Sequence, residues 1–208
     1  MKKVIAIIMV TTFMPLAAQN SNPLLKEWSG PYNGLPAFNE YKVSDFKPAL
    51  EIAMQEKLNE IDKIANNKKP ATFVNTIVAM EHAGKKLTRV LAVYGIYSSN
   101  MNSPEFEPVE TEFEPKLASL SDKIVQNSKL FKRIQSVYNS KAKSKLTKEQ
   151  QRLIWVQYDY FVRQGAKLDQ KTKSKVGKIN QKLAGLFTKF RQNLLSEENN
   201  KFRELKNE

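Results

Sequence analysis

The chain has 208 residues, with 34 Lys and Arg, 21 Asp and Glu, one His and no Cys. The lack of Cys excludes disulfides, thiolate metal sites, a Cys nucleophile and a lipid-modified N-terminal Cys, and a single His excludes any zinc site that needs two imidazoles from this chain. A hydrophobic content of 41% with 10% aromatic residues excludes a chain that is disordered by composition.

Residues 1–18 have the pattern of a secretory signal peptide. Two Lys at the start precede an apolar stretch, and the small residues after it predict cleavage between Ala18 and Gln19. The stretch is too short for a stable membrane span, although an uncleaved N-terminal anchor is the alternative. The signal predicts export, most simply to a bacterial periplasm, and removal of its two Lys lowers the net charge from +13 to +11.

Residues 19–43 are rich in Pro and Gly and predict an extended arm, with Trp28, Tyr32 and Phe38 as anchors to the body. No later run alternates with period two for long enough to predict a strand. Residues 44–208 therefore predict one helical lobe, and a mature chain of this length can bury roughly 70% of its surface.

The first predicted helix begins at Ser44 or Asp45 as the cap and ends at Asn66. A second helix begins at Thr72, and its apolar stripe includes Gly84, which indicates the close approach of another backbone.

A third helix opens at Ser103 and Pro104, and Pro115 is expected to kink or interrupt it. Asn127 and Ser128 are caps for a shorter fourth helix.

A fifth helix opens on a capping box formed by Thr147 and Gln150. A long sixth helix starts from Asp169 and is expected to fray after Ser196. It carries an apolar stripe at helical spacing, formed by Val176, Ile179, Leu183, Leu186, Phe187, Phe190 and Leu194. The predicted fold is therefore all-α, an irregular N-terminal arm followed by about six helices in a multi-helix lobe.

The positive charge is confined to the second half of the chain. Residues 19–110 hold 10 Lys and Arg against 11 Asp and Glu, whereas residues 111–208 hold 22 against 10. Most of the excess is Lys spread along polar helix faces, which predicts solvated surface. An acidic partner or an anionic surface is the second interpretation, and specific nucleic-acid binding is not expected.

No group of residues predicts an active site. His82 is expected to be a partly exposed structural residue, and no nucleophile-elbow or Gly-rich phosphate loop is present. The run Glu105, Glu107, Glu110, Glu112 and Glu114 has two-residue spacing, which scatters carboxylates around a helix. The aromatic residues expected in interhelical packing are Tyr94, Tyr97, Tyr158, Tyr160 and Phe161. We therefore predict no catalytic, cofactor-binding or metal-ligating residue in this chain.

An ordered series of segments resembles the N-terminal region of the thimet oligopeptidase family of zinc peptidases, in particular oligopeptidase A and peptidyl-dipeptidase, also called dipeptidyl carboxypeptidase. The segments include 22–25 (NPLL), 34–38 (GLPAF), 46–50 (FKPAL), 70–81 (PATFVNTIVAME), 161–168 (FVRQGAKL) and 190–195 (FRQNLL). Their order and spacing agree from about residue 22 to 200.

The resemblance implies a helical lobe that forms one wall of a substrate channel. The family's zinc is held in a later catalytic domain, where an HExxH helix supplies two His ligands and a general-base Glu. Residues 81–84 (EHAG) are not that motif, because the second His is absent. The resemblance thus implies zinc and oligopeptide substrates for the full-length protein, with a missing C-terminal catalytic domain as the partner of this chain.

Two functions follow from these observations. The first is the exported N-terminal lobe of a zinc peptidyl-dipeptidase-like enzyme, inactive alone because it lacks the HExxH site. The alternative is a free-standing exported basic helical protein that binds peptides or anionic surfaces. A lobe separated from its enzyme should expose apolar surface that the catalytic domain normally covers.

Overall fold

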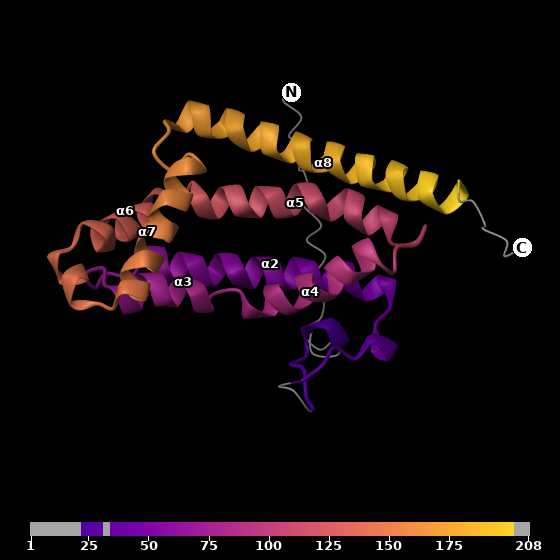
Figure 1. Cartoon of the computed structure of the whole chain (residues 1–208), viewed down its shortest axis with the longest axis horizontal. Helices are drawn as coiled ribbons and strands as arrows, with labels where there is room; N and C mark the ends of the chain where they lie inside the picture. The colour runs from indigo at the N-terminus through magenta and orange to yellow at the C-terminus, as the bar shows by residue number, and fades with distance from the viewer. Residues whose placement is uncertain (1–21, 31–33, 202–208) are drawn as a thin grey trace, which may run out of the picture.

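The computed structural model describes residues 22–30 and 34–201. The predicted signal peptide, with its cleavage between Ala18 and Gln19, and the predicted anchor Tyr32 lie outside these residues. The described part is all-α, as predicted, and six of its helices have 12 residues or more (Figure 1). Its α-helices are α2 (Val43–Ala65), α3 (Ala79–His82), α4 (Lys85–Ser99), α5 (Glu107–Val125), α6 (Ser128–Asn139), α7 (Lys148–Arg163) and α8 (Gln170–Asn200).

The arm before α2 is fixed to the helical body by apolar side chains. Leu24, in a short 3-10 helix, is buried, and Trp28 and Phe38 pack against the same core as expected. Asn22 also donates a hydrogen bond from its side-chain amide to the backbone carbonyl of Asp45 in α2, at 2.8 Å. Leu24 therefore anchors the arm together with Trp28 and Phe38, although it was not among the predicted anchors.

Two clusters of buried side chains form the core. The first lies among α2, α4 and α5 around Phe46, whose ring contacts those of Tyr97 and Phe106 at centroid distances of 4.8 and 5.0 Å. The second joins α6, α7, the end of α2 and a π-helix, η3 (Phe73–Val78). In the described part of the chain, α8 adds no apolar side chain to either cluster. Figure 1 shows α8 along the outer side of α5, which separates it from α2 and α4.

The predicted second helix is divided into η3, α3 and α4. Thr72 caps it as predicted and accepts the N–H of Asn75 at 3.1 Å. The division falls at Gly84, whose φ of +80° is left-handed, and a Cβ there would lie 2.2 Å from Cδ of Lys57. Gly84 is therefore required by the turn and by a neighbouring side chain, and the predicted approach of another backbone is wrong.

Gly84→Ala should lower the free energy of unfolding by about 1–3 kcal/mol, because the new side chain is strained at positive φ and displaces Lys57. Gly95→Ala is the matched control, since Gly95 lies within α4 with nothing near the position of a Cβ. Helix propensity predicts that this change raises stability by up to about 1 kcal/mol. Urea unfolding measures both, and changes of the same sign would contradict this account of Gly84.

Three further predicted helix caps are confirmed. Asn127 caps α6, Thr147 and Gln150 form a capping box at α7, and Asp169 caps α8. Each uses a short polar side chain to satisfy a backbone N–H that has no partner within the helix. The predicted fraying after Ser196 is not observed, because α8 continues to residue 200.

Three other predictions about helix limits are wrong. Helix α5 begins at Glu107, with Phe106 as its N-cap, and not at Ser103 and Pro104. Lys42 is the N-cap of α2, in place of Ser44 or Asp45, and the carboxylate of Asp45 instead accepts the N–H of Lys42 at 2.8 Å. Of the two effects expected at Pro115, the interruption does not occur, because α5 continues through this residue. Pro115 faces α8, where a Cβ on Gly185 would lie 4.0 Å from its ring, so interhelical packing offsets the lost backbone hydrogen bond.

Candidate functional site

The residues considered for chemistry are not brought together. His82 is exposed at the end of α3. The aromatic residues are divided between the first core (Tyr94 and Tyr97), the second core (Tyr158 and Phe161) and the surface (Tyr160, 44% exposed). Among residues 22–30 and 34–201, no group of three or more His, Cys, Asp and Glu side chains could hold a metal ion.

The acidic run in α5 is scattered over different neighbours, as its spacing predicts. Glu110 is 2% exposed and lies near α4 and α8. Glu112 instead pairs with Lys116 of its own helix at 2.6 Å and with Lys47 of α2 at 3.1 Å, and these hydrogen bonds lower the pKa of Glu112. Glu114 pairs with Arg191 of α8 at 3.2 Å. These carboxylates therefore stabilise contacts between helices and do not form a paired-carboxylate site.

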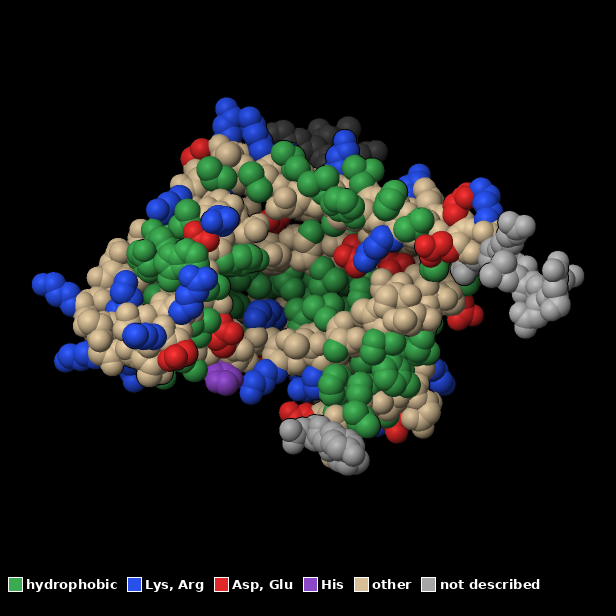
Figure 2. Space-filling view, in the orientation of Figure 1, with side chains coloured by type: hydrophobic (Ala, Val, Ile, Leu, Met, Phe, Trp, Pro, Cys, Tyr) green, Lys and Arg blue, Asp and Glu red, His purple; other side chains and the backbone are tan. Residues whose placement is uncertain are grey.

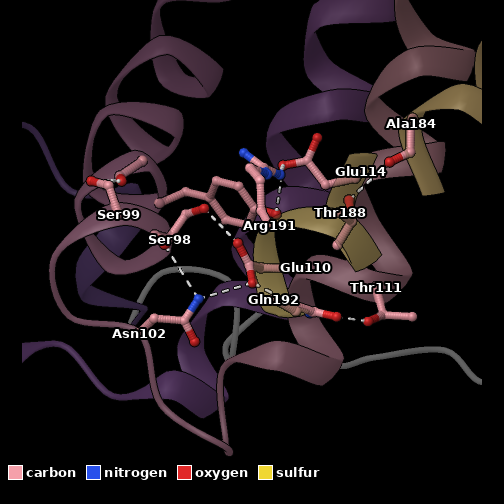
Figure 3. Close-up of polar contacts among 12 residues, drawn as sticks. Ser98, Ser99, Asn102, Glu110, Thr111, Glu114, Ala184, Thr188, Arg191 and Gln192 are labelled. Carbon is pink, nitrogen blue, oxygen red and sulfur yellow. Dashed lines mark hydrogen bonds and ion pairs between the residues drawn. The ribbon is translucent and has the colours of Figure 1, made fainter. Parts of the chain in front are cut away.

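Glu110 is the centre of a polar network that joins α4, α5 and α8 (Figure 3). Its carboxylate accepts hydrogen bonds from the Ser98 hydroxyl, from the Asn102 amide at 3.0 Å and from the Gln192 amide at 3.4 Å. All three donors are neutral. The Gln192 amide also donates to the carbonyl of Glu107 at 3.2 Å, so the network fastens α8 to the first turn of α5.

An ion pair between Arg191 of α8 and Glu114 of α5 lies next to this network (Figure 3). The Tyr94 hydroxyl donates a hydrogen bond to the same carboxylate at 3.1 Å. Burial, and then the negative charge of Glu114, raise the pKa of Tyr94 above its usual range. Tyr94 therefore stays protonated and keeps donating to Glu114.

We call the side of α8 that faces α5 its inner face. In the N-terminal half of α8, the residues on this face are also polar or small. The Asn180 amide donates to Asp122 of α5 at 2.7 Å, and a Cβ on Gly177 would lie 3.4 Å from that carboxylate. Lys173 is 6% exposed, and its ammonium group donates a hydrogen bond to the backbone carbonyl of Gln126. The side-chain amide of Gln126 in turn donates to the backbone carbonyl of Lys173 at 3.2 Å. Polar contacts thus hold α8 against α5 along most of its length.

Most of the large apolar side chains of α8 face away from α5. Figure 2 shows hydrophobic side chains exposed along this helix. We call six of them the outer stripe, with their exposed fractions: Ile179 57%, Leu183 43%, Leu186 55%, Phe187 64%, Phe190 64% and Leu194 48%. No helix in the described ranges is both long and apolar enough to cross a membrane.

A groove of about 440 Å³ lies among α2, α5 and α8. Apolar side chains from α2 and α5 form part of its lining, and Lys116 and Lys123 add positive charge. Lys116 is already paired with Glu112, and this hydrogen bond raises the pKa of Lys116. The lining of the groove is therefore mixed, with apolar side chains beside charged ones, and the described residues give it no arrangement for bond cleavage.

Glu110→Ala should lower the free energy of unfolding by about 2 kcal/mol, because it leaves the partly buried donors around the carboxylate without their acceptor. Glu105→Ala removes the same charge from an exposed position and should change stability by less than about 0.5 kcal/mol. Urea unfolding of both variants is the measurement, and equal losses would contradict a structural role for the network.

The inner face of α8 is the feature that the sequence reading missed. A signal for it exists in the spacing of Gly177, Ala184 and Thr188, which places small residues on one side of the helix, away from the outer stripe. Small residues permit close contact with α5, whereas helical periodicity alone predicts that the larger apolar residues form the buried face.

No family model matches the chain. The dipeptidyl carboxypeptidase of Escherichia coli (strain K12) is 35% identical over 175 residues, which make up 84% of this chain and 26% of that protein. The dipeptidyl carboxypeptidase of Salmonella typhimurium is 32% identical over 85% of this chain and 26% of its own length. The organellar oligopeptidase A of Arabidopsis thaliana is 24% identical over 85% of this chain and 22% of its own length. The chain thus spans about a quarter of the curated relatives that it matches.

These relatives confirm the resemblance predicted from the ordered segments. They are dipeptidyl carboxypeptidases and oligopeptidases A, the two kinds of protein indicated by the sequence. The similarity extends over most of the chain and is not confined to one short motif. Over these matched residues, the chain is similar to dipeptidyl carboxypeptidases and oligopeptidases A, as expected from its resemblance to the thimet oligopeptidase family.

Proposed function

We propose that this chain provides the N-terminal helical lobe of an exported zinc peptidyl-dipeptidase-like metallopeptidase. The observation that carries the proposal is a 35% identical match that covers 84% of this chain and 26% of a dipeptidyl carboxypeptidase. Such coverage is expected when a short chain corresponds to one part of a longer enzyme. A C-terminal catalytic domain would then be its main partner, and oligopeptides would be the substrates of the whole protein.

The zinc implied by the family resemblance does not fit the residues of this chain. The chain has one His and no Cys, and the described residues include no group of side chains suited to a metal. Zinc sites in peptidases generally take three protein ligands, which are His and carboxylate side chains. Metal binding and hydrolysis are therefore assigned to residues outside this chain.

We assign to the lobe the role of one wall of a substrate channel. The groove among α2, α5 and α8 supports this role, because Met54, Leu58 and Phe113 are available to contact apolar side chains of a peptide. Lys123 in its lining adds a positive charge that would favour an acidic side chain.

The proposed organisation has three parts. Residues 1–18 would direct export and be removed between Ala18 and Gln19, residues 19–43 would form the arm, and residues 44–208 would form the lobe. The charged start, apolar centre and small residues before Gln19 support export, with the periplasm as the destination.

The purified 208-residue chain should release no dipeptides from peptide substrates, with or without added zinc. A fusion should release them if residues 22–201 replace the matched quarter of the Escherichia coli dipeptidyl carboxypeptidase. Zinc-dependent cleavage by the chain alone, lost on chelation, would contradict the proposal, and so would an inactive fusion. Salt-sensitive binding of anionic polymers, together with an inactive fusion, would instead support the free-standing binding protein.

A further inference from the structure

The arrangement of α8 is the reverse of that expected for a surface helix. A surface helix normally buries its apolar face and exposes its polar face. In α8 the buried side chains are Lys173 and Thr188, whereas Phe187 and Phe190 are each 64% exposed. The outer stripe extends from Ile179 to Leu194, about 22 Å along the helix.

The polar contacts of the inner face fix this orientation. Asn180 is bonded to Asp122 near one end of the helix, and Arg191 and Gln192 are bonded to α5 near the other. Rotating α8 to bury the outer stripe against α5 would break all of these contacts. It would also leave the Asp122 carboxylate facing apolar side chains, which is costly for a charged group.

The outer stripe has a charged border on one side. Lys175, Lys178, Lys182 and Lys189 are exposed, and their spacing places them in a row beside the stripe. A continuous apolar stripe with a charged border is typical of an interaction surface rather than of scattered exposed residues. The fitting partner therefore has an apolar surface bordered by acidic side chains.

We propose that the outer stripe of α8 is the surface against which the remaining part of the family protein packs. This inference rests on the proposed function and names the face through which the lobe meets its partner. The chain spans only 26% of its dipeptidyl carboxypeptidase relatives, so most of a protein of that length would be available to cover the stripe.

A second copy of this chain is a poorer occupant. If two α8 helices paired antiparallel about a twofold axis, the symmetry would bring both Lys rows to the same side of the contact. The like charges would then oppose the association. A segment with acidic residues at the corresponding positions does not have this conflict.

Thiol labelling tests the proposal directly, because the chain has no Cys of its own. Phe190→Cys places one thiol in the outer stripe, and Val74→Cys places a control thiol at a position in η3 that is 68% exposed. In the 208-residue chain, both thiols should react rapidly with an alkylating reagent. In the fusion with the Escherichia coli enzyme, labelling at 190 should slow by about tenfold or more while labelling at 74 stays unchanged. Mass spectrometry of the peptides that contain residues 74 and 190 reports each site separately.

A pair of variants provides a second measurement. Phe187→Ser combined with Phe190→Ser should lower the melting temperature of the fusion but not that of the isolated chain. Trp155→Ser is the control, since Trp155 is an exposed aromatic residue on α7, outside the stripe. It should leave the fusion unchanged.

The outcomes separate this inference from the proposed function. An active fusion in which residue 190 labels rapidly and the serine pair has no effect would overturn the inference while leaving the proposed function intact. An inactive fusion of the unsubstituted chain would overturn both. Protection of residue 190 in the isolated chain, either with rising protein concentration or on adding anionic lipid vesicles, would also overturn the inference, because a second copy or a membrane would then be the occupant.

Discussion

Replacing Arg133 with Met is expected to lower the free energy of unfolding by about 3 kcal/mol. Arg133 is 8% exposed, and its guanidinium donates to the backbone carbonyls of Asn67 and Lys69 at 2.7 and 2.9 Å. It also donates to the side chains of Asn75 and Thr76 at 2.8 and 3.2 Å. Burial lowers the pKa of Arg133, but these four acceptors keep the cation hydrogen-bonded. Met would fill a similar volume and leave all four acceptors without this donor.

Lys132→Met is the matched control for Arg133, since Lys132 is exposed on the same helix. It removes the same charge and should change stability by less than about 0.5 kcal/mol. Urea unfolding measures both variants. Equal losses of stability for Arg133→Met and Lys132→Met would contradict the view that Arg133 holds the loop before η3 against α6.

Replacing Phe46 with Ala should cost about 4 kcal/mol of stability. Phe46 is fully buried, and its ring meets three aromatic rings, those of Tyr94, Tyr97 and Phe106, in the first core. Removing the ring leaves a cavity that these neighbours can fill only in part. Thermal and urea unfolding of the isolated chain should show the loss as one cooperative shift.

Phe190→Ala is the control for Phe46, because it removes the same ring from a position that is 64% exposed. In the isolated chain it should change stability by less than about 0.5 kcal/mol. Similar costs for the two variants would mean that the outer stripe is packed inside this chain, contrary to the structure.

The local features of the fold could be predicted because their causes are local. Thr147 and Gln150 form a capping box within four residues of sequence. Asp169 caps α8 by accepting the backbone N–H of Thr172, only three positions away. The break at Gly84 was not predicted, because it depends on Lys57, which lies 27 positions away in α2. Pro115 likewise stays within α5 where it faces α8.

The candidate site was harder to predict, because helical periodicity identifies the apolar face of a helix but not what covers it. The sequence predicted an apolar stripe from Val176 to Leu194, of which Val176 is half-buried in the structure. The contacts of Asp122, Glu110 and Glu114 with α8 decide that the part from Ile179 onward points outward. The buried position of Glu110 depends on donors from two other segments of the chain, so its spacing within an acidic run gave no sign of it.

The central proposal is that this chain provides one lobe of a peptidase-like protein and that residues outside this chain supply the catalysis. The most direct test is to sequence the DNA that follows codon 208 in the source genome. We expect a reading frame, continuous or displaced by one shift, that encodes the rest of a dipeptidyl carboxypeptidase-like protein with an HExxH motif. A downstream region without such a frame would contradict the claim.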